Sequence, residues 1–270
     1  MKVLVAMAAS TLLLAALPSH AQWEQVPDSR IPRNSTGEAD LSAPAPRTAA
    51  GKIDLSGVWV PDGDPLPEGI EGIEGDIPLP RHMINIMADM EPDEVELHPW
   101  AAELFQQRLE NRGIDSPLAH CKPTGIPLLN AILLPFKIVQ TDDLVLILYE
   151  ENTVFRQIFL DGRKTVEDPM PRWMGYSTGE WDGNELVVET VGMIEDSWLD
   201  GLGHPHTEAM KLTERFRRTD AGHLEIETTI DDPETFSKPV TYTVPTTLIP
   251  DADLLEYFCS ENEKSSAHYQ

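Results

Sequence analysis

From residue 135 onward, short strand-like segments alternate with turn-forming residues, and this pattern limits the folds that the chain can adopt. Apolar and polar residues alternate as in β-strands in segments 136–141, 144–150, 153–159, 175–181, 185–191, 206–218, 223–230, 239–244 and 254–259. Turn residues such as Asp182-Gly183-Asn184 separate the segments and favour hairpins. With an earlier strand that ends at Trp59, the sequence predicts a mainly β fold of about ten antiparallel strands. So many consecutive strands favour a closed barrel or a two-sheet sandwich, because closure removes exposed strand edges.

One segment before these strands, residues 98–113, has clear helical features. Pro99 stands in its first turn, Gly113 follows its last residue, and its apolar residues share one face. Those apolar residues are Trp100, Leu104, Phe105 and Leu109. We therefore expect one or two helices beside the strands.

The composition divides the chain into three parts. Residues 1–21 have the features of a secretory signal peptide, because Lys2 precedes a short apolar run and small residues precede a cleavage position after Ala21. Residues 22–50 have scattered proline, serine and alanine without apolar periodicity, so we expect a flexible N-terminal arm. Residues 51–270 are expected to form a single β-barrel domain.

The predicted signal peptide implies export, so the mature protein is expected to be periplasmic or secreted. Cys121 and Cys259 are the two cysteines of the chain, and in an oxidising compartment they are expected to form one disulfide. No later segment approaches the ~20 apolar residues of a transmembrane helix, so no membrane insertion is expected. A net charge of −26 excludes nucleic acid as a partner, since its phosphates would be repelled.

A polar cluster inside the barrel is predicted by the segment Gly203–Arg218 and its neighbours. If residues 206–217 form one strand, the even positions carry most of its apolar residues and turn inward. These even positions are His206, Glu208, Met210, Leu212, Glu214 and Phe216. Neighbouring strands are predicted to add Tyr149, Arg156 and Glu189 to the same interior. Buried carboxylates are costly unless they are paired, so this cluster needs cations or hydrogen-bond donors.

The predicted cluster has two interpretations. It can be a structural network in which Arg156 neutralises a glutamate and joins strands. It can also be a catalytic site, with His206 as general base, Glu208 orienting it, and Glu214 or Glu189 as a second acid. The arginine and the tyrosine of the cluster would then stabilise negative charge on a substrate. The catalytic interpretation predicts a cofactor-independent lyase, isomerase or hydratase.

A metal site is a third alternative. His204, His206 and Glu208 stand at positions i, i+2 and i+4, so on a continuous strand they would converge on one side. Nitrogen and oxygen ligands of this kind suit a divalent transition metal such as zinc or iron. Pro205 between the histidines instead favours a loop at His204.

Several motifs resemble a large, mostly uncharacterised family of exported bacterial β-rich proteins: DLSGVW, PFKIVQT, RQIFLDGR, WDGNELVVET, GHPHTEA and TERFRR. The resemblance extends from about residue 55 to residue 263; it implies a shared fold and transfers no catalytic residue. Gly57-Val58-Trp59 is also similar to the G-x-W signature of lipocalins, whose barrels hold small apolar ligands. This similarity implies a lipocalin-like barrel.

Taken together, these features predict a barrel with an internal cavity for a small organic molecule. The cavity wall is expected to include Trp59, Trp100, Trp173, Met210 and Phe216. We expect either an acid–base enzyme without a cofactor or a carrier of a small apolar ligand that uses the same cavity. The sequence leaves the oligomeric state open.

Overall fold

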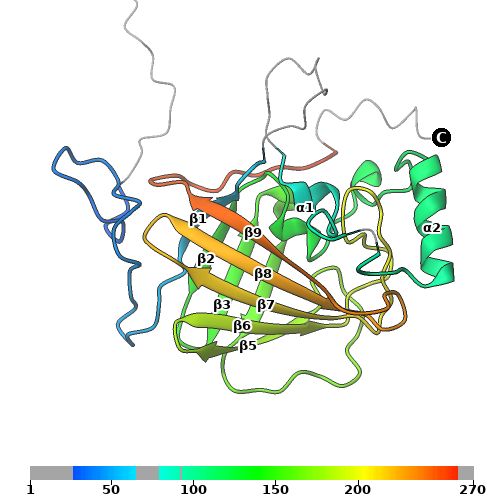
Figure 1. Ribbon diagram of the computed structural model, residues 1–270. Helices are drawn as coiled ribbons and strands as arrows, with labels where there is room; N and C mark the ends of the chain where they lie inside the picture. The colour runs from blue at the N-terminus through cyan, green and yellow to red at the C-terminus, as the bar shows by residue number, and fades with distance from the viewer. Residues whose placement is uncertain (1–26, 65–78, 92, 261–270) are drawn as a thin grey trace, which may run out of the picture.

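A closed β-barrel forms the centre of the molecule in the computed structural model, which describes residues 27–64, 79–91 and 93–260 (Figure 1). The strands of these residues are β1 (Gly57–Pro61), β2 (Phe136–Gln140), β3 (Leu144–Tyr149), β4 (Phe155–Phe159), β5 (Tyr176–Asp182), β6 (Glu185–Val191), β7 (Lys211–Arg218), β8 (His223–Asp231) and β9 (Val240–Leu248). They follow one another around the barrel in chain order, and β1 pairs with β9 to close it. The predicted barrel is therefore confirmed. The predicted signal peptide lies outside the described residues.

The barrel has nine strands within the described residues rather than about ten. Residues 254–259 were expected to form the last strand, but they have no regular structure. Strand directions can alternate all the way around a closed barrel only when the number of strands is even. One neighbouring pair must therefore be parallel.

That parallel pair is β4 and β5, so the prediction of an entirely antiparallel barrel is wrong at this position. The other neighbouring strands are antiparallel. Residues 160–175 form a long connection between β4 and β5, after which the start of β5 lies beside the last two residues of β4. The pairing comprises only Ile158 with Ser177 and Phe159 with Thr178. This short parallel seam has fewer backbone partners than the β3–β4 pair on the other side of β4, where five residue pairs face each other.

Helix α2 (Pro99–Glu110) confirms the helix expected from the sequence, with proline at its first position. A second, short helix is α1 (Arg81–Ile84), and three 3-10 turns are η1 (Leu118–His120), η2 (Leu128–Asn130) and η3 (Glu151–Thr153). Helix α2 lies to one side of the barrel (Figure 1), and Trp100 and Leu109 on its expected apolar face are 41% and 37% exposed. Among the described residues, no helix has the length and apolar character to cross a membrane.

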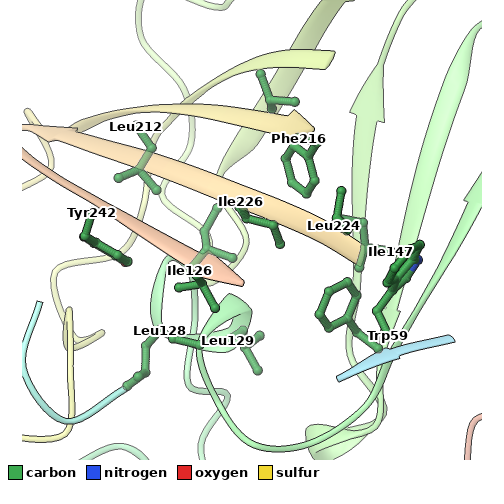
Figure 2. Packing of buried hydrophobic residues seen from close by; sticks show 14 of the residues in the cluster. Trp59, Ile126, Leu128, Leu129, Ile147, Leu212, Phe216, Leu224, Ile226 and Tyr242 are labelled. Atoms are coloured by element: carbon green, nitrogen blue, oxygen red, sulfur yellow. The ribbon is translucent and has the colours of Figure 1, made fainter. Parts of the chain in front are cut away.

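Large apolar side chains fill the barrel interior (Figure 2). Trp59, Ile147 and Phe216 are at most 1% exposed, and the indole N–H of Trp59 donates to the carbonyl of Leu55 at 3.0 Å. Residues 124–132, which we call the plug, are buried throughout and reach the same core from one end of the barrel. The interior is therefore a packed core.

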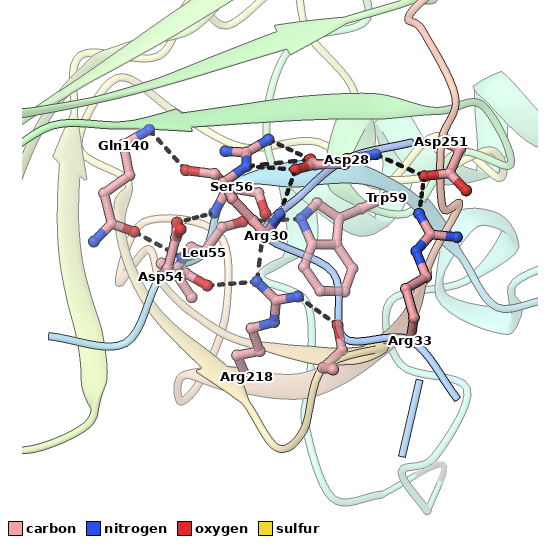
Figure 3. Close-up of polar contacts among 11 residues, drawn as sticks. Asp28, Arg30, Arg33, Asp54, Leu55, Ser56, Trp59, Gln140, Arg218 and Asp251 are labelled. Carbon is pink, nitrogen blue, oxygen red and sulfur yellow. Dashed lines mark hydrogen bonds and ion pairs between the residues drawn. The ribbon is translucent and has the colours of Figure 1, made fainter. Parts of the chain in front are cut away.

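A buried arginine covers the opposite end of the barrel (Figure 3). The guanidinium of Arg218 lies 4.8 Å from the ring centroid of Trp59 and donates to the carbonyls of Asp220 and Ser56 at 3.1 and 3.3 Å. Burial lowers its pKa to about 10, which leaves the guanidinium charged at neutral pH. The cation–π contact and these hydrogen bonds fix the chain crossing at this end.

Residues 27–50, where a flexible arm was expected, make defined contacts with the same end of the barrel. Ile31 is buried in the core, and the backbone N–H of Asp28 donates to the Asp251 carboxylate at 2.8 Å (Figure 3). The carbonyl of Leu41 accepts a hydrogen bond from the Gly222 N–H at 2.8 Å. The proline-rich composition excludes long strands here but allows these contacts.

The expected disulfide between Cys121 and Cys259 is present. It spans 138 residues and joins the chain just before the plug to the segment after β9. Closing so long a loop restricts the unfolded chain far more than the folded one.

We predict that the double variant Cys121→Ser/Cys259→Ser loses free energy of unfolding, by up to about 5 kcal/mol on the chain-entropy model. Urea unfolding of the oxidised protein and the variant measures the difference. The wild-type protein with reductant is the control and should match the variant. An equal stability of variant and oxidised wild type would contradict the prediction.

Candidate functional site

A buried ion pair lies in the barrel interior, between Arg156 of β4 and Glu214 of β7. Arg156 Nη1 donates to Glu214 Oε1 at 3.0 Å, and Nη2 contacts the other carboxylate oxygen. The remaining guanidinium donors reach Ser177 Oγ at 3.0 Å and Thr190 Oγ1 at 2.8 Å. Burial opposes the charge on Arg156, but the contact with Glu214 outweighs it and raises the arginine pKa.

The plug completes this network from the other side. Asn130 Nδ2 donates to Glu214 Oε1 at 2.7 Å, and the Tyr149 hydroxyl donates to Asn130 Oδ1 at 2.7 Å. Burial raises the pKa of Tyr149, so its phenol stays neutral. The inward positions expected for Arg156, Glu214 and Tyr149 are confirmed, and their mutual hydrogen bonds agree with the structural interpretation of the cluster.

Three other members of the expected cluster lie elsewhere. Strand β7 begins only at Lys211, so His206 and Glu208 precede the strand, and Glu208 is exposed. Glu189 is exposed as well, because Thr190 and not Glu189 takes the inward position in β6. The predicted inward orientation of Glu189 and Glu208 is therefore wrong, and neither carboxylate joins Arg156 in a shared acid–base centre.

His206 is buried in the loop between β6 and β7, with both ring nitrogens held by the protein. Its Nε2 lies 2.7 Å from Ser197 Oγ and its Nδ1 lies 3.0 Å from the carbonyl of Thr207. Burial lowers the pKa of His206, which favours the neutral ring. The residue borders a groove of about 430 Å³ with Trp100 and Arg108, but neither nitrogen is available to a ligand there.

The residues considered for a metal site do not converge. His204 Nδ1 lies 2.5 Å from Asp200 Oδ2, and its ring stacks on Phe105 with centroids 4.0 Å apart. Glu208 points to the surface. Within the described ranges, no group of three or more histidine, cysteine or acidic residues is arranged to hold a metal ion.

The side chains expected to line one internal cavity are also dispersed. Trp59, Met210 and Phe216 belong to the packed core. Trp100 lies on α2, where its indole N–H donates to the carbonyl of Glu234 at 2.8 Å. Trp173 alone among the five lines an aromatic groove on the outer side of the barrel.

This groove, which we call the seam groove, lies beside the parallel seam and has a volume of about 470 Å³. Four aromatic side chains, Phe155, Phe159, Trp173 and Tyr176, line it, and Phe155 is 56% exposed. Its lining residues are Pro123, Thr153, Val154, Phe155, Gln157, Phe159, Arg172, Trp173, Met174, Gly175, Tyr176 and Ser177. No other concavity described above combines so many aromatic rings.

The groove follows from the way the chain enters β5. Before Ser177, the chain is not paired with β4 and instead forms a bridge between Arg172 and Met193, which lies just after β6. The turn uses Gly175 at φ +57°, where a Cβ would lie 2.7 Å from Thr190 Cγ2 and 2.9 Å from the carbonyl oxygen of Val191. Only glycine fits this left-handed, crowded position, so the divergence of β4 and β5 is built into the sequence.

Comparison with protein-family models, curated proteins and solved structures finds no match to this chain. The resemblance to exported β-rich proteins therefore stays a prediction. The seam groove has to be interpreted from its own geometry.

Residues 175–179 match the hydrolase pattern G-x-S-x-G, with Ser177 at the serine position. The pattern marks a nucleophile only where a strand turns sharply into a helix, whereas Ser177 lies within β5 and is 1% exposed. Its hydroxyl contacts Arg156 and Thr190, and within the described part of the chain it has no hydrogen bond to a histidine. Ser177 thus connects the groove floor to the buried ion pair.

Glu151 is a buried acid that the sequence analysis did not single out. It is 2% exposed, and its Oε1 accepts hydrogen bonds from Thr124 Oγ1 at 3.0 Å and Asn152 Nδ2 at 2.7 Å. Its Oε2 is buried with no hydrogen-bond partner among the described residues. Burial raises the pKa of the Glu151 carboxyl. Glu151 lies between a strand that ends at Tyr149 and a turn, and this short segment has no sequence pattern that indicates the burial of its side chain.

The ion pair gives a prediction for stability. Arg156→Met leaves Glu214 buried without its cation, and this should lower the free energy of unfolding by about 3–5 kcal/mol. Urea unfolding measures the loss. The double variant Arg156→Met/Glu214→Leu should recover part of it, because the uncompensated charge is gone. A single variant within about 1 kcal/mol of wild type would contradict a tethering role.

Glu151 gives a prediction for pH. A carboxyl whose pKa is raised on folding stabilises the protein below its ordinary pKa, and this contribution is lost as pH rises through the higher folded value. Wild type should therefore lose stability relative to Glu151→Gln as pH rises from about 4 toward neutral. Urea midpoints across that range test this, with the exposed Glu208→Gln as control. A constant difference at all pH values would contradict it.

Proposed function

We propose that this protein binds a small, mainly apolar organic molecule in the seam groove, on the outside of the barrel. The observation that carries the proposal is the gathering of Phe155, Phe159, Trp173 and Tyr176 around one groove of about 470 Å³. Ligand sites for small molecules are concave, lined by apolar and aromatic groups, and have few polar residues. An exposed phenylalanine in such a groove gains contacts when a ligand covers it.

The outer position follows from the packing of the barrel. The side chains expected around an internal ligand, such as Trp59 and Phe216, already pack against one another. The plug and the Arg218–Trp59 contact occupy the two ends. A ligand inside would have to displace this core, whereas the seam groove is open in the folded structure.

Binding without turnover accounts for the groove better than acid–base catalysis. The lining residues that the structure describes include no histidine, aspartate, glutamate or cysteine, so they supply no general base near neutral pH. The groups considered for catalysis are buried in other contacts, as with His206, or exposed elsewhere, as with Glu208. The function proposed is therefore that of a carrier or binding protein. The disulfide fits an oxidising, exported location for it.

The proposal predicts binding of the neutral fluorescent probe N-phenyl-1-naphthylamine, whose emission rises in apolar surroundings. Phe155→Ser should weaken this binding at least about fivefold, because a ligand loses one aromatic face of the groove. Leu255→Ser, which removes an apolar side chain of similar exposure outside the groove, is the matched control and should leave affinity unchanged. Equal binding by Phe155→Ser and wild type would overturn the proposal.

A further inference from the structure

The seam groove differs in charge from the rest of this chain. The sequence has 46 acidic residues and a net charge of −26, yet the described residues that line the groove include no carboxylate. The other described concavities do contain them: Asp28 and Asp54 at the Arg218 end, Asp200 beside the plug, and Glu195 in the groove at His206. An acid-free concavity in so acidic a chain indicates a ligand that carboxylates would repel.

Among the described residues that line the groove, Arg172 is the one charged residue. Its backbone is fixed on both sides, since its N–H donates to the Gly192 carbonyl at 2.9 Å and its carbonyl accepts from the Ile194 N–H at 3.1 Å. Its side chain is exposed and makes no ion pair with any acid in the described residues. An exposed guanidinium on a fixed backbone therefore stands at an aromatic groove, with its donors available.

A second arginine near the groove shows the contrast. Arg163 stacks over the lining residue Phe159, 3.8 Å from the ring centroid, but its guanidinium is already paired with Asp161. The Asp161 carboxylate therefore neutralises the Arg163 guanidinium within the protein. Arg172 has no such partner among the residues that the structure describes, so an anion that binds there displaces no ion pair of that part of the chain.

We infer that the ligand of the seam groove is an organic anion, an aromatic or aliphatic body with a carboxylate or sulfonate group that Arg172 binds. This inference rests on the proposed function. The apolar body would lie against Phe155, Trp173 and Tyr176, and the anionic group would accept hydrogen bonds from the guanidinium. A neutral apolar ligand that covered Arg172 would remove water from a cation without replacing its interactions, whereas an anion compensates for that loss.

The test compares two probes with one skeleton: neutral N-phenyl-1-naphthylamine and its 8-sulfonate, 1-anilinonaphthalene-8-sulfonate. Affinities for both probes are measured for wild type, Arg172→Gln, Arg112→Gln and Phe155→Ser. Arg112 is an exposed arginine outside the groove, so its variant reports the general effect of removing one positive charge. Arg172→Lys is added to separate charge from the geometry of the guanidinium.

Arg172→Gln should weaken the sulfonate about fivefold and change the neutral probe less than about twofold, with Arg112→Gln changing neither by more than about twofold. Arg172→Lys should recover part of the sulfonate affinity. The inference is overturned if Arg172→Gln leaves the sulfonate affinity unaffected, or if it weakens both probes equally, while Phe155→Ser still weakens neutral-probe binding. Failure of the proposed function is a different result, in which Phe155→Ser changes neither probe.

Discussion

The ion pair between Arg156 and Glu214 is the interaction on which the arrangement of the barrel depends. It joins β4 to β7 through the interior, and its further hydrogen bonds reach Ser177, Thr190 and Asn130. A shift of one residue in strand register would move either charge to the opposite face and leave its partner buried alone. The pair therefore specifies the register of strands that are distant in sequence. It also occupies the space that a ligand inside the barrel would need.

The number of strands determines where the molecule can have an opening. Because nine strands cannot alternate direction around a closed barrel, one parallel pair is unavoidable, and the long connection of residues 160–175 places it between β4 and β5. The chain diverges there at Gly175, and aromatic side chains border the gap. The seam groove is thus a direct consequence of the topology, at the position where strand pairing is shortest.

Much of the fold can be predicted from the sequence, because hairpin turns, alternation and the two cysteines are local signals. The orientation of the candidate site residues is harder to predict, because the apolar pattern around them is ambiguous. In β6, the three consecutive apolar residues Leu186, Val187 and Val188 place apolar side chains on both faces of the strand. Alternation therefore does not decide which way Glu189 points. Before β7, apolar alternation continues back through Met210 although the strand begins at Lys211. The seam groove depends on the pairing of β4 with β5, which no local pattern encodes.

The groove and the buried network are physically connected, and this bears on how a ligand affects the protein. Ser177 lines the groove and also accepts a hydrogen bond from Arg156, so the strand that forms the groove wall is held by the ion pair. A ligand seated between β4 and β5 adds contacts across the seam that has the fewest backbone pairs. It should therefore stabilise the barrel at its least supported junction, by mass action on the folded state alone. Ligand binding and barrel stability are linked at this position, because the parallel seam between β4 and β5 both creates the seam groove and has the fewest paired residues.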